Sequence, residues 1–386
     1  MRIPLAAPDV TEQDIAAVAC ALRSSRLSLG PKLEEFEHAL AGYVGAAHAV
    51  AVSSGTSALH LCIRALGIGE GDEVIVPSFA FIAVANAVRY ERAIPVFVDV
   101  DPLTLNLDPG LIEAAITSRT RAILVVHTFG CPAELSEIIR IARRHRLLVI
   151  EDACEAIGAE YDGRKVGPQG DAGVFAFYPN KQITTGEGGA IVTGNPAVAT
   201  LARKLRNQGR SDSEDWFEHT ELGYNYRISE INCALGIEQL KRIEAVLERR
   251  GVVAANYQCR LGNNPALLLP PLALPRRRIS WFVYVVRLSG QFSQFHRDWI
   301  MEEITARGIG CGRYFAPIHL QPIYKHASFE RMALPVTESN AARSLALPFF
   351  NCIREDQVEE VCGTLEELVC QAARLTPAGR ISATPP

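Results

Sequence analysis

Short, continuous apolar segments alternate with helical segments over the first half of the chain, and this alternation constrains the fold more than any other feature. A continuous apolar run is typical of a strand that helices cover on both faces. Repeated alternation of such strands with helices predicts an α/β protein with a mainly parallel, doubly wound sheet. We expect strands at 49–52, 73–77, 93–98, 121–126, 147–150, 174–177 and 190–192, and helices at 11–22, 32–44, from the 53–57 segment to 66, and 133–145.

The pattern changes near Asn225, which suggests a second domain. The chain has 386 residues, more than one hydrophobic core usually serves. We expect a long helix at about 229–254, a strand at 280–288 and further α/β alternation to about residue 373. The predicted division is a large domain at 1–250, a smaller α/β C-terminal domain at 251–375, and a disordered tail at 376–386.

Composition excludes several classes of function. The chain is 48% apolar and 21% charged with a net charge of −4, as in an ordinary soluble protein, and it has no basic stripe that would predict a nucleic-acid partner. The N-terminus does not read as a signal peptide, and the most apolar stretch, Phe79–Val88, is too short for a membrane span, so we predict a cytoplasmic protein without a membrane partner. The cysteines include no Cys-x-x-Cys pair, which argues against a metal site and a disulfide framework.

Three polar segments follow predicted strands, and ligands of doubly wound sheets bind beyond the carboxyl ends of the strands. Ser53–Ser57 precedes a helix and could hold a phosphate, although Ser and Thr are more often helix caps there. Asp152 ends a strand and could pair with a pyridinium nitrogen, although a cap or a surface acid fits equally well. Lys181 precedes a glycine-rich turn, whereas a lone lysine is usually solvated and protonated.

Together, a phosphate loop, a carboxylate and an amine are the parts that a pyridoxal 5′-phosphate (PLP) site needs. The three segments follow one another along the chain as phosphate loop, carboxylate and amine. With this order of motifs, the chain resembles the DegT/StrS family of PLP-dependent sugar aminotransferases, which share the aspartate-aminotransferase-like fold. The resemblance covers nearly the whole chain. Its motifs are Leu29–Pro31, Ser53–Leu59, Gly69–Ser78, Phe97–Pro102, Glu151–Ala153, Gly170–Asp171, Tyr178–Lys181, Gly186–Gly189, Gly223–Arg227 and His319–Pro322.

The resemblance implies roles for individual residues. Lys181 would bind PLP covalently and shuttle protons, and Asp152 would bind the pyridine nitrogen. Asn225 would reach the phosphate in a neighbouring subunit, which implies a homodimer with shared active sites. The remaining positions are the phosphate contacts Gly55 and Thr56, the ring-stacking Phe81, and the sugar-nucleotide contacts Tyr314 and His319.

Two positions depart from the family pattern. Glu155 stands where many members have Gln and would add a negative charge near an oxygen of the cofactor. Ala176 stands where many have Ser and would remove a hydroxyl from the cofactor phosphate. Both departures concern the details of cofactor binding rather than the class of enzyme.

The resemblance implies that glutamate donates an amino group to a nucleotide-linked keto sugar, in polysaccharide, O-antigen or secondary-metabolite sugar biosynthesis. The expected acceptor is a 4-keto-6-deoxyhexose on dTDP, UDP or GDP, with a 3-keto sugar or a keto-inositol as alternatives. A catalytically inactive PLP-binding regulator is an alternative of another class, and the intact Lys181 and Asp152 favour the enzyme. Arg206 and Arg210 are candidate phosphate contacts, although surface ion pairs fit them equally well.

Overall fold

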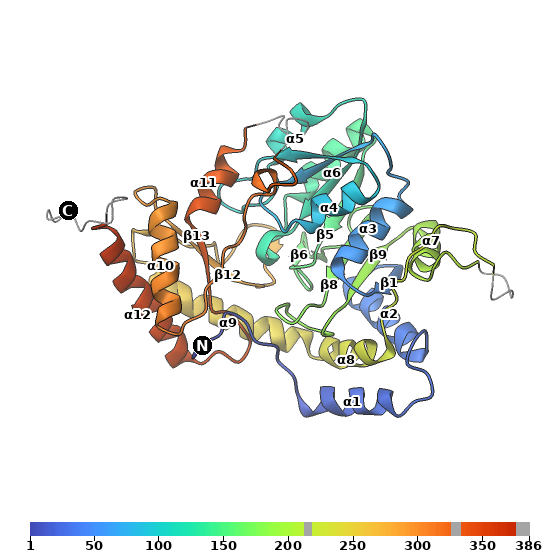
Figure 1. Cartoon of the computed structure of the whole chain (residues 1–386), viewed down its shortest axis with the longest axis horizontal. Coiled ribbons are helices and arrows are strands. Elements are labelled where there is room, and N and C mark those ends of the chain that lie inside the picture. Colours follow the sequence, from blue (N-terminus) through green and yellow to red (C-terminus); the bar gives the residue numbers. More distant parts are fainter. Residues whose placement is uncertain (212–217, 326–332, 376–386) are drawn as a thin grey trace.

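A seven-stranded sheet forms the centre of the molecule (Figure 1). The computed structural model describes residues 1–211, 218–325 and 333–375, so the predicted tail at 376–386 lies outside the described residues. The strand order is β1-β9-β8-β5-β4-β2-β3. The strands are β1 (His48–Val52), β2 (Glu73–Pro77), β3 (Ile94–Val98), β4 (Thr120–Val126), β5 (Leu148–Asp152), β8 (Ala172–Ala176) and β9 (Gly189–Thr193).

The predicted mainly parallel sheet is confirmed. β3, β2, β4, β5 and β8 pair in parallel, and β9 runs antiparallel to both of its neighbours, β8 and β1. Alternate residues of one strand enter different hydrophobic clusters: Ala49 and Ala51 belong to one and Val50 and Val52 to the other. Both faces of the sheet are therefore buried, which explains why its strands are apolar without a break.

Two groups of helices cover the two faces of the sheet (Figure 1). Each helix presents an apolar stripe to the sheet, and these stripes complete the two clusters. On one face lie α2 (Pro31–Val44), α5 (Pro109–Ala115), α6 (Leu135–His145) and α8 (Glu230–Lys241). On the other lie α3 (Gly55–Ala65), α4 (Ala83–Tyr90) and α7 (Pro196–Arg206).

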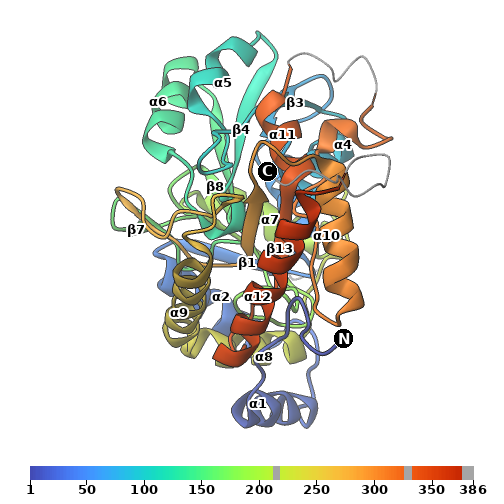
Figure 2. The ribbon, with the colours of Figure 1, turned by 90° about the vertical axis from the view of Figure 1, so that its left-hand side faces the viewer.

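A third hydrophobic cluster surrounds a smaller antiparallel sheet in the order β10-β12-β13. α10 and α12 lie beside each other in this part of the molecule (Figure 2). Its elements are α9 (Ile243–Leu261), β10 (Leu267–Leu268), β12 (Tyr284–Leu288), α10 (Gln294–Ala306), α11 (Pro335–Arg343), β13 (Ser344–Leu347) and α12 (Glu355–Ala372). The start of α9 packs in the first cluster and its end in the third, so the domain boundary predicted near residue 250 falls inside this helix and stays a prediction.

The remaining elements are short or peripheral. They are α1 (Glu12–Leu22), the 3-10 turns η1 (Thr128–Gly130) and η2 (Ile318–Leu320), and a small sheet of β6 (Glu160–Tyr161), β7 (Arg164–Lys165) and β11 (Arg277–Arg278). α1 begins as its sequence predicts, because Thr11 and Asp14 form a reciprocal capping box.

The single long helix expected at 229–254 is wrong. The structure has two helices, α8 and α9, that meet at Arg242, whose φ of −110° lies outside the helical range. The guanidinium of Arg242 forms ion pairs at 2.9 Å with Asp9 and Asp14 near the N-terminus. These partners lie far away in the sequence, so helical periodicity carried no sign of the break.

The expected strand at 280–288 is shorter in the structure and begins at Tyr284. The residues before Tyr284 instead contact segments that belong to the large-sheet part of the molecule. The N–H of Ser280 donates to the carbonyl of Gly130 at 3.0 Å, and the side chain of Gln182 donates to the carbonyl of Ser280 at 3.0 Å. These contacts bring Phe282 towards the turn that carries Lys181.

Candidate active site

Lys181 lies in the turn between β8 and β9. The N–H of Phe177 donates to the carbonyl of Gly188 at 2.9 Å and closes the base of this turn. The Lys181 side chain is 13% exposed, and its Nζ lies 3.7 Å from Oε1 of Glu155. The same Nζ lies 4.0 Å from the centroid of the Phe282 ring. The amine is thus held between a carboxylate and an aromatic face rather than solvated as a surface lysine would be.

Two carboxyl groups lie at the end of β5. Oδ1 of Asp152 accepts the N–H of Cys154 at 3.0 Å, and Oε2 of Glu155 accepts the N–H of Phe129 at 2.9 Å. Both residues are buried. Burial raises the pKa of Glu155 above its ordinary value, and the Lys181 cation opposes that rise only in part.

The N-terminus of α3 forms a cradle next to these groups. Ser54 is the N-cap, and its Oγ accepts the N–H of Ser57 at 3.0 Å. The N–H groups of Gly55 and Thr56 donate to no acceptor in the described part of the chain. A Cβ on residue 55 would lie 2.7 Å from the Cβ of Ala176, so glycine keeps this cradle open. Two free donors at a helix N-terminus can bind an anion such as a phosphate.

These groups line one cavity of about 570 Å³ beyond the carboxyl ends of the parallel strands. The side chains come from segments that follow different strands, as doubly wound sheets predict. The structure brings together seven of the residues singled out from the sequence. They are Gly55, Thr56, Phe81, Asp152, Glu155, Lys181 and Tyr314.

Tyr314 is partly buried at the side of the cavity formed by the C-terminal half of the chain. Its hydroxyl accepts a long hydrogen bond of 3.5 Å from the Asn180 amide, and its ring contacts those of Phe129 and Phe282. Burial, reinforced by the nearby Glu155 carboxylate, raises the pKa of Tyr314 to about 12. The phenol is therefore a neutral hydrogen-bonding group at physiological pH.

His319 does not line the cavity, in contrast to its expected role beside the sugar nucleotide. Its Nδ1 lies 2.6 Å from the hydroxyl of Ser78, and its Nε2 lies 3.3 Å from Oε1 of Glu338. Both ring nitrogens thus have partners within the chain. In this structure His319 joins the end of β2 to α11.

Asn225 also lies outside the cavity lining and is exposed. It sits between Tyr224 and Tyr226, whose rings stack with centroids 5.0 Å apart. The hydroxyl of Tyr224 donates to Oε1 of Glu91 at 3.1 Å and anchors this segment to the end of α4. Asn225 is therefore presented on the surface by a well-anchored loop, away from the cavity of its own chain.

Arg206 was left open as a phosphate contact or a surface ion pair, and in this structure it is neither. Arg206 is 6% exposed, forms an ion pair with Glu37 and donates to the carbonyl of Ala51 at 2.7 Å. It joins α7 to α2 and β1 as part of the core. Arg210 does not line the cavity either.

Phe282 and Arg313 line the cavity and were not identified as site residues from the sequence. Phe282 belonged to a segment interpreted only as a strand, and nothing in its spacing indicated a position next to Lys181. Arg313 directly precedes Tyr314, but none of the motifs of the resemblance includes it. Their place in the site depends on contacts between distant segments.

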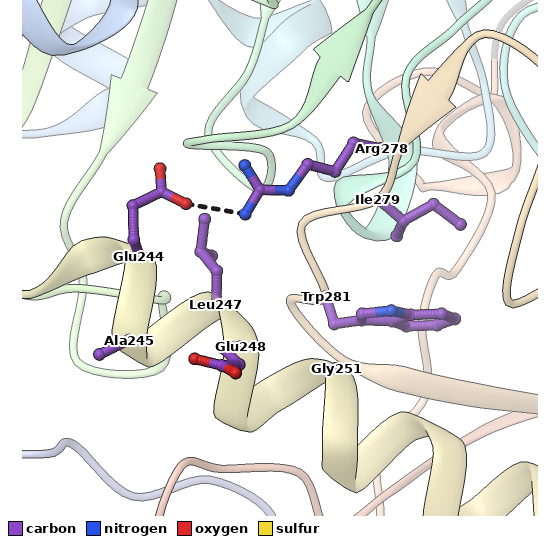
Figure 3. A pocket seen from close by; sticks show the side chains of 8 residues that line it. All are labelled: Glu244, Ala245, Leu247, Glu248, Gly251, Arg278, Ile279 and Trp281. Carbon is purple, nitrogen blue, oxygen red and sulfur yellow. Dashed lines mark hydrogen bonds and ion pairs between the residues drawn. The ribbon is translucent and has the colours of Figure 1, made fainter.

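A second cavity of about 460 Å³ lies between the first turns of α9 and the 278–281 segment (Figure 3). Arg278, the cation in its lining, is paired with Glu244 at 2.7 Å. None of the three polar segments singled out from the sequence reaches it. We therefore place the candidate site in the first cavity.

No helix in the described ranges is long and apolar enough to cross a membrane. Within the same ranges, no group of three or more His, Cys, Asp or Glu side chains could hold a metal ion.

The substitution Glu155→Gln should change how stability depends on pH. Because the pKa of Glu155 is raised in the folded chain, the contribution of this carboxyl group to stability is full below the unfolded pKa and is lost as pH rises through the folded pKa. Gln does not titrate, so the Tm of the variant should rise relative to wild type as the pH increases above about 4.3, the ordinary pKa of Glu. Thermal unfolding without added PLP measures this difference.

Glu187→Gln is the matched control, because Glu187 lines the same cavity but is exposed. Its difference in Tm from wild type should stay flat over the same pH range. A flat or falling difference for Glu155→Gln would contradict the assigned direction of the Glu155 pKa.

Three comparisons with known proteins agree. The DegT/DnrJ/EryC1/StrS aminotransferase family matches residues 8–366. GDP-perosamine synthase of Caulobacter vibrioides is 42% identical over 374 residues, covering 95% of this chain and 98% of the relative. Among solved structures, DesV of S. venezuelae has a TM-score of 0.86 and 39% identity, covering 92% of this chain and 94% of DesV. A sugar aminotransferase from Streptococcus pneumoniae in its PLP form has a TM-score of 0.91 and 26% identity, covering 96% and 99%.

Proposed function

Because the chain belongs to the DegT/DnrJ/EryC1/StrS aminotransferase family, it is a PLP-dependent sugar aminotransferase, and we propose that it transfers the amino group of glutamate to a nucleotide-linked keto sugar. The observation that carries this proposal is the arrangement of Lys181. Its amine lies in a cavity that also holds a buried carboxylate, Asp152, and a free helix N-terminus at Gly55.

The residues of the cavity fit PLP. The unpartnered N–H groups of Gly55 and Thr56 would bind its phosphate, and the Asp152 carboxylate would pair with its pyridine nitrogen. Phe81, which is 62% exposed and lines the cavity, has a face available for stacking on a flat ring. Lys181 supplies the amine that would hold the cofactor covalently.

When bound, PLP carries the amino group between substrates and withdraws electrons from the carbon that loses a proton. The chain supplies the other parts of the chemistry. Nζ of Lys181 would take and return that proton, which requires a neutral amine. The raised pKa of Glu155, whose carboxyl group lies 3.7 Å away, favours its protonated form, and the ring of Phe282 lies against the amine.

We propose a GDP-linked 4-keto-6-deoxyhexose as the acceptor. The support is the relative named GDP-perosamine synthase, which matches over nearly the full length of both chains. dTDP- and UDP-linked sugars, 3-keto sugars and keto-inositols are the competing acceptors. A panel of these keto compounds, offered to enzyme already loaded with the amino group, separates them by which one is converted to an amine.

The test of the proposed function is an absorption spectrum of purified protein before and after glutamate. The visible band of protein-bound PLP should fall as the near-ultraviolet band of its aminated form rises. A keto sugar should then reverse the change. A protein that binds no PLP after reconstitution would refute the cofactor assignment, and a spectrum that glutamate leaves unchanged would refute the donor.

We also propose that the enzyme is a homodimer whose sites are shared. The support is the exposed, anchored position of Asn225 outside the cavity of its own chain. Lys181→Ala and Asn225→Ala proteins should each be inactive or strongly impaired. Random mixed dimers should regain about a quarter of wild-type activity, because half of the dimers are mixed and each has one intact site. No recovery after subunit exchange would mean that Asn225 acts within its own chain.

Ala176→Ser should leave transaminase activity and PLP affinity close to the wild-type values. Ala176 ends β8 and lines the cavity next to Gly55. A hydroxyl added there would lie beside the N-terminus of α3, where the N–H groups of Gly55 and Thr56 are already available to a phosphate. Titration of the unloaded protein with PLP measures the affinity. A large loss of affinity would show that the Ala176 side chain packs too tightly against Gly55 to accept an oxygen.

A further inference from the structure

The charges that line the cavity are unevenly distributed. The acids are Asp152, Glu155 and Glu187, and the cations are Lys181 and Arg313. Lys181 lies at the inner end, since its side chain is 13% exposed, whereas that of Arg313 is 56% exposed. An anionic substrate that enters this cavity would meet three carboxyl groups, so it needs a fixed cation near the solvent side.

Arg313 is held in place from outside the cavity. One of its terminal nitrogens donates to Oδ1 of Asp298, on α10, at 3.0 Å. The same oxygen accepts Nε of Arg297, which is 4% exposed and donates to the carbonyls of Ala341 and Ser344. Asp298 is therefore fixed by a buried partner and tethers Arg313 by a single bond.

The backbone on either side of Arg313 is fixed as well. Gly312 and Ala346 of β13 exchange two backbone hydrogen bonds of 3.2 and 2.8 Å. Tyr314 packs its ring against Phe129 and Phe282. The remaining N–H groups of the Arg313 guanidinium donate to no acceptor among residues 1–211, 218–325 and 333–375. A rigidly mounted guanidinium with unused donors is suited to bidentate binding of an oxyanion.

We propose that Arg313 binds an oxyanion of the substrate at the outer end of the cavity and that Asp298 positions it. This inference rests on the proposed function, which supplies two sources for the oxyanion: the diphosphate of the nucleotide sugar and a carboxylate of the amino donor. Arg206 cannot serve, because it is buried against Glu37, and both ring nitrogens of His319 already have partners.

The test compares PLP-loaded wild type with Arg313→Gln, Arg313→Lys and Asp298→Asn. In one arm, calorimetry measures the Kd for GDP at low and high salt. In the other, single-turnover absorption measures the glutamate concentration dependence of amino loading without nucleotide. Arg313→Gln should weaken the binding of GDP, of glutamate or of both by roughly tenfold to a hundredfold. The affinity that is weakened should also depend less on salt than in wild type. Arg313→Lys keeps the charge but loses the planar guanidinium, and Asp298→Asn keeps an acceptor oxygen but loses the negative charge that holds Arg313, so both variants should lie between.

Arg354→Gln is the matched control, because Arg354 is 65% exposed and paired with one aspartate, Asp356, away from the cavity. It should bind GDP and glutamate as wild type does. Weaker GDP binding alone would identify the diphosphate, a change in the glutamate dependence alone would identify the carboxylate, and a change in both would show that the two substrates use the same anchor in turn.

Equal behaviour of Arg313→Gln and wild type in both arms would overturn the inference while leaving the proposed function intact. A wild-type enzyme that neither binds GDP, UDP or dTDP nor responds to glutamate would instead refute the proposed function. An unchanged PLP spectrum and Tm in each variant show that the fold and the cofactor site are preserved.

Discussion

Lys181→Ala should abolish amino transfer, with a loss of roughly 10⁴-fold or more in the rate of the glutamate half-reaction. The variant loses both the amine that holds the cofactor and the group that moves the proton. Its PLP should dissociate on dialysis, and the visible spectrum should lack the band that covalent attachment produces. Stopped-flow absorption after mixing with glutamate measures the rate.

Lys165→Ala is a close control for this variant. Lys165 also combines an ion pair, 3.4 Å from Glu244, with an aromatic partner, 4.6 Å from the centroid of the Tyr43 ring, but it lies outside the cavity. Its removal should leave the rate and the spectrum unchanged. Since Lys181→Ala also leaves Glu155 without its cation, the Tm of the variant should be compared at mildly acidic pH. Wild-type kinetics in a folded Lys181→Ala protein would refute the assigned role.

Asp152→Asn should reduce the rate of the half-reaction by roughly 10²-fold or more and weaken PLP binding. The amide keeps the size of the side chain and can still accept the Cys154 N–H, so the fold should be preserved. It removes the negative charge that would keep the pyridine nitrogen protonated, and with it the electron withdrawal that the reaction needs. Single-turnover rates and a PLP titration measure the two effects separately.

Asp171→Asn, at the residue directly before β8, provides the comparison. Asp171 is exposed, and its carboxylate accepts the N–H of Val149 at 2.8 Å near the opposite end of β5. Its substitution should alter stability slightly and the rate not at all. If Asp152→Asn loses only PLP affinity and keeps a normal rate at saturating PLP, the carboxylate contributes to cofactor binding but not to the electron withdrawal that the reaction needs.

The sequence alone predicted the class of fold and the nature of the cofactor site. Continuous apolar strands identify a sheet covered on both faces, and the positions after β1, β5 and β8 identify its carboxyl edge. Gly55, Asp152 and Lys181 therefore meet in one cavity, as their places along the chain predicted. The reason is topological: parallel strands direct their carboxyl ends to the same edge, whichever residues separate them.

Only the tertiary structure decided which other side chains join them. Phe282 reaches Lys181 because Ser280 crosses to Gly130, and Arg313 reaches the cavity because β13 holds Gly312. Arg206, which the sequence left open as a phosphate contact, instead forms an ion pair with Glu37. The break between α8 and α9 at Arg242 has the same kind of origin, since its partners lie near the N-terminus.

The pattern of residues along a strand or helix thus determines which face is buried and where each strand ends, because these depend on local periodicity. The pairing of charged and aromatic side chains between distant segments depends on the packing of the whole chain. The raised pKa of Glu155 belongs to this second group, because its burial and its 3.7 Å approach to Lys181 exist only after the chain has folded. Sequence therefore determined the place and class of the chemistry, and tertiary packing decided its electrostatics and the groups available to the substrate.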